Sequence, residues 1–493
     1  MKKSLHYSLL LSFLATILLI VTFSYHLKIL ISPQIQETRE NSTIITTELL
    51  AEGQNPYSLS HMPENTNVYG ILYNLVCFPF AKIFPSTYLL YRSISAFFIF
   101  ASVFLLFKII KIFKVRNTYA YIASVLFYSQ IVGRGYDFLA RPDSLGLFLF
   151  LSSFYVVFKH KFSNKSILFA LVLSFLAFLA KPYFLISGFY ISFYIFLTQS
   201  KKHAVIFVST YIFGFLLLLL LVNTIFETYI LNVIFISISA SNNSLFHLFL
   251  QTGFYLMWNI EIVILLVLIF IFELNTKKLL KILSPEVCFL ILSAFLLYTK
   301  LGWHQGNFIT YFNHLISPFL FIVIFKNLNL IKSARIKNIG NILLFSVLVK
   351  MICYYLFFMP SVPYQIAQWN NWTNILKNKN DVYVHPDLSL LAFDQEKYIY
   401  DTGQAYYFKY ALKYRSYIPN YQKISEDYNK YLENINQMVA EKKFDLIVLE
   451  PNSQEVIIPK DSLEKNYYPL QEADVKMFRY TQKLVVWFPV TKN

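Results

Sequence analysis

Charged residues are scarce in this chain. They make up 14% of its 493 residues, whereas a soluble globular protein carries about 25%. Hydrophobic residues reach 56% and aromatic residues 19%, with 50 phenylalanines and 37 tyrosines. This shortage of charge argues against an ordinary soluble domain and directs attention to how the apolar residues are distributed.

Cysteine is also rare, and glycine-rich motifs are missing. The three cysteines, Cys77, Cys288 and Cys353, lie in or beside apolar runs, and none belongs to a CxxC or Cys/His pattern. A disulfide framework and a zinc site are therefore not expected. The sequence contains neither a glycine-rich phosphate loop nor an internal repeat. We predict no cofactor and no metal site, with a divalent metal as the open alternative.

Long apolar runs are what the chain does contain. Residues 8–31, 204–222 and 249–272 reach or approach the roughly 20 residues that a helix needs to cross a bilayer. Inside lipid the backbone must bond to itself, so such runs are helical. We predict an α-helical polytopic membrane domain over 1–359 with about eleven spans: 8–31, 88–107, 117–133, 143–158, 166–182, 183–199, 204–222, 250–272, 286–300, 307–325 and 339–359.

The net charge of +16 arises entirely within residues 1–359. Residues 360–493 carry 16 basic and 16 acidic residues, which cancel. In the membrane domain, lysines and arginines gather in alternate connections, as the positive-inside rule requires. This pattern predicts a cytoplasmic N-terminus, an extracytoplasmic C-terminus and a location in the cell membrane. It also explains the basic excess without nucleic acid as a partner.

Two segments outside the spans show patterns of their own. The first outer loop, 32–87, contains an amphipathic stretch at Thr43–Glu52 and an aromatic stretch at Val68–Phe84, which favours an interfacial helix. The tail, 360–493, alternates short strands with a helix, so we predict a small extracytoplasmic α/β domain. Its expected elements are strands at Asp381–His385, Lys397–Tyr400, Phe444–Glu450 and Leu484–Phe488, and a helix at Tyr428–Lys443.

Ionisable residues in or beside the spans require an explanation, because they are costly in lipid. In the predicted topology one set shares the outer face: Glu37, Arg39, Glu40, Arg134, Asp137, Arg141, Asp143, Lys181, Lys300 and His304. Acids and bases at one interface can form a site for an anionic, lipid-linked substrate. Lysines and arginines at span ends also commonly extend to the lipid headgroups without any function in a site, and this interpretation has comparable weight. A structural pair is the expectation for Glu261 and Lys350.

Several motifs carry a family resemblance. The stretch RENSTIITTELLAEGQNPY, in which Glu40 precedes Gly53 by 13 residues, resembles the first outer loop of the C-type (GT-C) membrane glycosyltransferases. The bacterial relatives of protein mannosyltransferases and aminoarabinose transferases are the most similar group. ARPDSLGLFLFL, with Asp143, and FLAKPYFL, with Lys181, resemble later motifs of that group in the same order. GNFITYFNHLISP, with Asn307 and Tyr311, resembles its late element, although His314 stands where the family often has Glu.

The resemblance implies a reaction and roles for residues. Such enzymes transfer a hexose or pentose from a polyprenyl-phosphate donor to a lipid, glycan or protein acceptor. Glu40 would be the general base and Asp143 would orient the acceptor or the base. Lys181 and Arg141 would bind the donor phosphate. Glu37, Asn307 and Tyr311 are weaker candidates for substrate binding, and membrane lipids are expected partners.

Two other classes of membrane protein remain as alternatives. A transporter or lipid flippase also needs charges within the membrane, but no inverted repeat or matched pair of Gly/Pro-broken helices is evident. A polysaccharide polymerase or ligase would carry an arginine-rich late outer loop, which this chain lacks. Dependence on a polyprenyl-phosphate sugar separates the first alternative from the glycosyltransferase.

Overall fold

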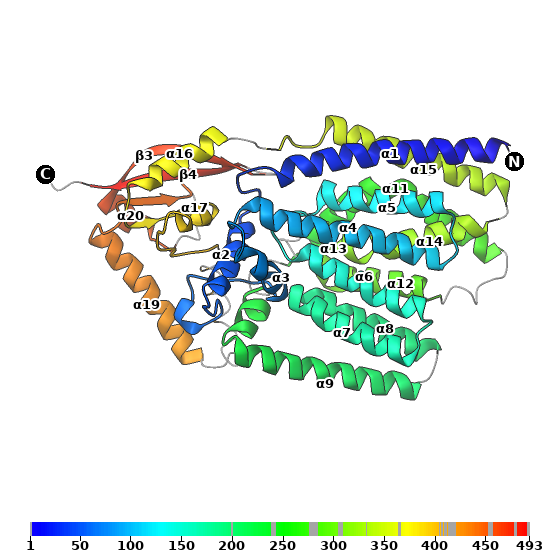
Figure 1. Ribbon diagram of the computed structural model, residues 1–493, viewed down its shortest axis with the longest axis horizontal. Coiled ribbons are helices and arrows are strands. Elements are labelled where there is room, and N and C mark those ends of the chain that lie inside the picture. Colours follow the sequence, from blue (N-terminus) through cyan, green and yellow to red (C-terminus); the bar gives the residue numbers. More distant parts are fainter. Residues whose placement is uncertain are drawn as a thin grey trace.

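The computed structural model combines a bundle of apolar helices with a small domain at one end (Figure 1). The structure describes residues 2–198, 201–237, 243–275, 284–303, 309–331, 333–362, 366–403, 405, 408, 412, 421–451, 457–477 and 481–490.

Within these ranges, each of the eleven expected spans is helical. Five described helices or parts of helices are long and apolar enough to cross a membrane: Tyr7–Leu30, Tyr88–Ile112, Lys201–Ile225, Leu245–Ile271 and Ala334–Phe357. These long apolar helices indicate a helical membrane protein. The helices of the bundle are α1 (Lys2–Leu30), α4 (Tyr88–Ile112), α5 (Asn117–Arg134), α6 (Asp143–Lys159), α7 (Asn164–Ala180), α8 (Ile186–Thr198), α9 (Lys201–Ile225), α11 (Leu245–Asn275), α12 (Pro285–Thr299), α13 (Thr310–Leu315), α14 (Ser317–Leu330) and α15 (Ala334–Phe357).

Proline residues interrupt the helices at two points of the bundle. Helix α7 ends at Ala180, and Pro182 opens a short 3₁₀ turn, η2 (Pro182–Leu185), before α8. Likewise α13 ends at Leu315, and Pro318 lies in the first turn of α14. Proline disfavours helical geometry in the residue before it and lacks an N–H, so it starts helices more readily than it continues them. Both breaks lie at the end of the bundle that faces the small domain (Figure 1).

The first outer loop folds into short helices between the bundle and the small domain. Helix α2 (Arg39–Ala51) begins four residues earlier than the expected amphipathic stretch, and η1 (Leu59–His61) and α3 (Leu72–Ala81) follow. Another short element, the π-helix η3 (Leu231–Ile236), follows α9. The apolar side chains of Leu75, Phe80, Ile83 and Phe84 in and after α3 are exposed.

The small domain contains a four-stranded sheet with the order β1-β2-β4-β3. Strands β1 and β2 are parallel, and β4 pairs antiparallel with both β2 and β3. The helix α19 buries Ile424, Tyr428, Tyr431, Ile435 and Val439, at intervals of three and four residues. The elements are α16 (Ile366–Lys377), β1 (Val382–Tyr383), η7 (Pro386–Leu388), α17 (Ser389–Phe393), α19 (Tyr421–Ala440), β2 (Leu446–Leu449), α20 (Lys460–Asn466), β3 (Tyr467–Lys476) and β4 (Thr481–Pro489).

The sequence prediction for this domain was correct in kind and wrong in two details. Lys397–Tyr400, expected as a strand, has no strand geometry. Strand β3 was not predicted, because it is an edge strand with mostly exposed side chains and lacks a clear apolar alternation.

Polar contacts join the small domain to the first outer loop. Gln34 Nε2 donates to the carbonyl of Lys476 at the end of β3 (2.8 Å). Asn41 Nδ2 donates to the carbonyl of Pro386 (2.8 Å), and the Thr402 amide donates to the carbonyl of Glu64 (2.9 Å). The loop is thereby held between the domain and the ends of the bundle helices.

Candidate functional site

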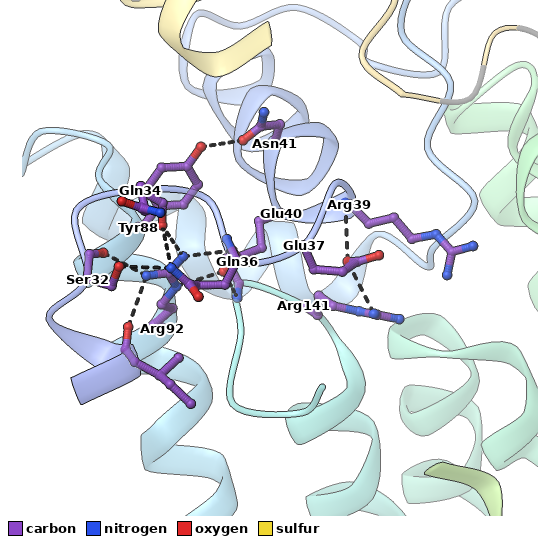
Figure 2. Close-up of polar contacts among 12 residues, drawn as sticks. Ser32, Gln34, Gln36, Glu37, Arg39, Glu40, Asn41, Tyr88, Arg92 and Arg141 are labelled. Atoms are coloured by element: carbon purple, nitrogen blue, oxygen red, sulfur yellow. Dashed lines mark hydrogen bonds and ion pairs between the residues drawn. The ribbon is translucent and has the colours of Figure 1, made fainter. Parts of the chain in front are cut away.

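A buried ion pair fixes the start of the first outer loop. Arg92, on α4, donates from Nε and Nη2 to the two carboxylate oxygens of Glu40, at 2.8 and 2.7 Å, and both side chains are fully buried. Its remaining N–H groups donate to three carbonyls, which belong to Ile29, Ser32 and Gln34. Figure 2 shows this guanidinium surrounded by the loop. All five donors of Arg92 are therefore used to shape the chain between α1 and α2.

The hydrogen-bond acceptor positions of Glu40 are all used as well. Besides Arg92, it accepts hydrogen bonds from the amides of Gln36 (2.8 Å) and Ala140 (2.9 Å). A carboxylate offers about four acceptor positions, and these contacts fill them. The geometry fits a structural ion pair that joins α2, α4 and the segment after α5. It does not fit the expected general base, which needs an acceptor position for the substrate hydroxyl.

A second charged group lies a few residues away and contains four of the predicted site residues. Arg141 Nε lies 3.3 Å from Asp143 Oδ2, and Arg141 Nη1 donates to Glu37 Oε2 at 3.2 Å (Figure 2). Lys181 Nζ donates to the other oxygen of Asp143. The side chain of Glu37 is 12% exposed and that of Asp143 is 1% exposed. We call Glu37, Arg141, Asp143 and Lys181 the charged cluster.

Local sequence explains why these side chains meet. Asp143 occupies the first position of α6, where a carboxylate is favoured by the helix dipole. Lys181 follows the last residue of α7 and is held there by the helix break at Pro182. Helices α6 and α7 pack along each other, so the start of one lies beside the end of the other. The adjacent side chains then form an ion pair.

Aromatic rings line this cluster. The ring of Tyr69, from the first outer loop, lies 5.4 Å from Arg141 Cζ and 5.4 Å from Lys181 Nζ. The ring of Tyr136 also lies 5.4 Å from Arg141 Cζ. Burial raises the pKa of Tyr69, so its hydroxyl stays protonated and can serve as a donor.

A third group extends the site toward α13. His314 Nε2 lies 2.6 Å from Asp137 Oδ1, and both side chains are fully buried. The other ring nitrogen, Nδ1, is hydrogen-bonded to the Tyr183 hydroxyl. The Tyr183 ring lies 4.4 Å from that of Tyr311 and 5.6 Å from Lys181 Nζ. Tyr311, a predicted substrate-binding residue, is thus at the edge of the site.

The structure therefore brings some of the predicted site residues together and places others elsewhere. Glu37, Arg141, Asp143 and Lys181 come together, and Glu40 is in the neighbouring structural pair. Asn307 lies outside the described residues. Sequence reasoning missed Arg92 and Tyr183, and it noted Asp137 and His314 without joining them. Partners that are 52 and 177 residues apart in the chain, as Glu40–Arg92 and Asp137–His314 are, leave no local signal.

An apolar groove of about 640 Å³ lies along α8, between α9 and α12. Its first lining residue, Ile186, is five residues after Lys181 in the chain, and the groove extends along α8 to Phe196. Its other lining residues include Phe189, Phe193 and Phe295. Ten residues of helix correspond to roughly 15 Å, so the groove has the length of a hydrocarbon chain segment.

No protein-family model matches the chain, and a search of curated proteins finds no match.

Proposed function

We propose that this protein is a membrane glycosyltransferase of the C-type (GT-C) class, which moves a sugar from a polyprenyl-phosphate donor to an acceptor hydroxyl. The supporting observation is the charged cluster, in which Arg141 and Lys181 flank Asp143 beside the first outer loop. The two cations, and the apolar groove along α8 whose first lining residue is five residues after Lys181, match the two parts of such a donor, a phosphate and a hydrocarbon chain.

The cations suit the leaving group. When the acceptor oxygen bonds to the anomeric carbon, the bond from that carbon to the phosphate oxygen breaks, and its electron pair stays on the phosphate. Arg141 and Lys181 stabilise that charge in a site with little water, where such contacts are strongest. Before the donor binds, Asp143 and Glu37 balance the two cations. Asp143 keeps Lys181 in position for the phosphate.

Glu37 is the carboxylate that we assign as general base. It has the greatest side-chain exposure of the carboxylates in the charged cluster, and its oxygen Oε2 is held by Arg141 and by the Arg39 amide, each at 3.2 Å. It can therefore meet an acceptor hydroxyl and take its proton as the new glycosidic bond forms. Glu40, expected in this role from the sequence, positions Glu37 through the loop that both share.

The apolar groove along α8 is the proposed place for the first isoprene units of the donor. Its walls are phenylalanine and aliphatic side chains from three helices, and it is open toward the surface of the bundle. Burying a hydrocarbon chain there would contribute to binding in proportion to the apolar area covered. The acceptor is a lipid, glycan or protein hydroxyl that approaches from the side of the first outer loop.

The proposed orientation places the site on the outer face of the cell membrane. The N-terminus lies at the opposite end of the bundle from the small domain (Figure 1). The lysine-rich connections after α4, α6 and α8 follow helices that run away from that domain. The positive-inside rule puts these connections in the cytoplasm, which gives eleven spans and an extracytoplasmic C-terminus.

A reporter fused after Val490 tests the orientation. We expect activity of an alkaline phosphatase fusion, which folds only outside the cytoplasm, and no signal from a cytoplasm-dependent fluorescent fusion. A fusion within the connection after α6, at Lys161, should give the opposite pair of signals. The same result at both positions, or the reverse assignment, would reject this topology.

Transfer itself is tested with the purified full-length protein in liposomes. We would supply a panel of radiolabelled polyprenyl-phosphate hexoses and pentoses, together with membrane extract as acceptor source, and measure release of polyprenyl phosphate. The proposal requires release with at least one sugar and its loss in Glu37→Gln. Movement of intact donor or solute across the bilayer without cleavage would instead identify a flippase or transporter.

A further inference from the structure

Tyr69, in the first outer loop, has a buried hydroxyl that the reaction described so far does not use. The residue is 5% exposed, and its hydroxyl has no hydrogen-bond partner among the residues that the structure describes. Burying a hydroxyl without a partner costs free energy, so nearly all such groups in folded proteins are hydrogen-bonded. A buried, unpaired donor beside a candidate substrate site indicates that the substrate supplies its acceptor.

The backbone on both sides of the Tyr69 ring is held firmly. The Tyr69 amide donates to Asn67 Oδ1 at 3.1 Å, and its carbonyl accepts from the Tyr57 hydroxyl at 2.8 Å. The next residue, Gly70, packs so closely on the end of α7 that an added Cβ would lie 2.0 Å from the Leu179 oxygen. These contacts fix the point from which the ring projects, and they leave only its hydroxyl unpaired.

The Tyr69 side chain lies beside the charged cluster. Its ring is 5.4 Å from Arg141 Cζ and 5.4 Å from Lys181 Nζ, so it is equally close to both proposed phosphate-binding cations. The charged groups that act on its hydroxyl are, strongest first, Arg141, Arg39, Glu37 and Asp143. A phosphate held between the two cations would therefore lie against this tyrosine.

The protonation state of Tyr69 suits a hydrogen-bond donor. Burial raises the pKa of its hydroxyl and outweighs the opposite effect of Arg141 and Arg39. The phenol therefore keeps its proton at neutral pH and has one O–H to donate. Phosphate oxygens are strong acceptors, and a hydrogen bond to a charged acceptor is stronger than one between neutral groups.

We propose that Tyr69 is a substrate-binding residue whose hydroxyl donates a hydrogen bond to an oxygen of the donor phosphate held by Arg141 and Lys181. This inference rests on the proposed function. During transfer the bond between the anomeric carbon and the phosphate oxygen breaks, and its electron pair stays on the phosphate. The hydrogen bond from Tyr69 then strengthens as the phosphate gains charge, and the tyrosine keeps its proton throughout.

The test compares Tyr69→Phe with the unmodified full-length protein in detergent and uses farnesyl methyl phosphate as the ligand. This phosphodiester has an isoprenoid chain and no sugar, so it probes the phosphate site alone. Phenylalanine keeps the ring beside both cations and removes only the hydroxyl. We expect the dissociation constant to rise by about 10- to 100-fold, the range for one hydrogen bond to a charged group.

Thermal melting gives a second readout that a merely structural role would not produce. Without ligand, Tyr69→Phe should melt at the temperature of the unmodified protein or above it, because the removed hydroxyl has no partner in the described part of the chain. With ligand, the unmodified protein should melt at the higher temperature, since a ligand that binds the folded state stabilises it more when it binds more tightly. A lower melting temperature for Tyr69→Phe without ligand, together with unchanged binding, would show that the hydroxyl is structural.

The matched control is Tyr73→Phe, at another buried tyrosine of the same loop. The Tyr73 hydroxyl is hydrogen-bonded to the Tyr91 carbonyl and to the Ser95 hydroxyl, each at 2.8 Å. Tyr73→Phe should therefore melt at a lower temperature without ligand and bind farnesyl methyl phosphate as the unmodified protein does. If both variants lost the same affinity, the effect of Tyr69→Phe would be a general loss of packing in the loop, and the inference would be rejected.

The outcomes also separate this inference from the proposed function. If Lys181→Met abolishes binding and Tyr69→Phe binds as tightly as the unmodified protein, the role of Tyr69 is rejected and the proposed function stands. If the unmodified protein binds no phosphodiester, both proposals fail.

Discussion

Arg92 contacts both carboxylate oxygens of Glu40 and, with its other N–H groups, three backbone carbonyls between Ile29 and Gln34. The pair therefore ties the end of α1, the start of α2 and the first turns of α4 to one another. This relationship determines the position of Glu37, which lies between the carbonyls and Glu40 in the chain. It also changes the expected effect of substitutions in this loop.

Glu40→Gln should mainly lower the stability of the folded protein. The substitution leaves the buried guanidinium of Arg92 without its counter-charge, and breaking one side of a buried ion pair costs about 3–5 kcal/mol. We expect a lower melting temperature in detergent and less folded protein in the membrane. Glu37→Gln, in contrast, should fold normally and lose about 100-fold or more in transfer rate as a general base would. If Glu40→Gln folded but was inactive, and Glu37→Gln stayed active, Glu40 would be the general base.

The apolar helices of the bundle could be predicted from the sequence, because a helix in lipid needs a continuous apolar run that is visible locally. The charged cluster was predicted in part for a related reason. Asp143 and Lys181 stand out at the ends of apolar runs, where a charge is conspicuous. Arg92 was missed because it lies one turn inside α4, in a run that otherwise resembles any span.

The tertiary pairings could not be predicted in the same way. Glu40 has the spacing to Gly53 that the family resemblance emphasises, but its role depends on Arg92, Gln36 and Ala140, which approach only in the folded chain. Similarly, His314 was noted only as a departure from the family motif. Its neighbours Asp137 and Tyr183 come from other helix ends, so no single segment of the sequence contains the group.

Lys181→Met tests the assignment of the phosphate site. Methionine keeps most of the length of the side chain and removes the charge that faces Asp143 and the proposed phosphate. We expect the donor concentration for half-maximal rate to rise by about 10- to 100-fold. The matched control is Lys165→Met, at an exposed position near the start of α7. Equal effects at the two positions would reject Lys181 as part of the phosphate site.

Gly70→Ala should separate the first outer loop from α7. An added Cβ at Gly70 would lie 2.0 Å from the Leu179 oxygen and 2.5 Å from its carbonyl carbon, and these backbone atoms cannot rotate away. Overpacking of this kind costs about 1–3 kcal/mol. Since Tyr69 contacts Lys181, donor use should fall together with the melting temperature.

The control for this substitution is Gly253→Ala in α11, where nothing lies within 4 Å of the added Cβ. Its melting temperature should stay within a few degrees of the unmodified protein. If Gly70→Ala behaved in the same way, the close approach of the loop to α7 would be refuted.

Glu64 provides a pH-dependent test of the contact between the first outer loop and the small domain. Its backbone carbonyl accepts hydrogen bonds from the Thr402 amide at 2.9 Å and the Thr402 hydroxyl at 3.1 Å. Burial raises the pKa of the Glu64 carboxyl, with a further contribution from Asp401. Among the described residues, its Oε2 has no hydrogen-bond donor.

The direction of the effect follows from linkage. A raised pKa means that the folded protein holds the Glu64 proton at pH values where the unfolded chain, with a value near 4.5, has released it. The contribution of this group to stability is therefore full below about pH 4.5 and is lost as the pH rises through the folded-state pKa. Glu64→Gln cannot lose a proton, so its melting temperature should match that of the unmodified protein at pH 4.5 and exceed it increasingly toward neutral pH. Glu52→Gln, at an exposed position of the same loop, is the control for removing a carboxylate, and its melting temperature should stay close to that of the unmodified protein. Parallel melting curves for Glu64→Gln at every pH would show that this carboxyl is not buried against the small domain.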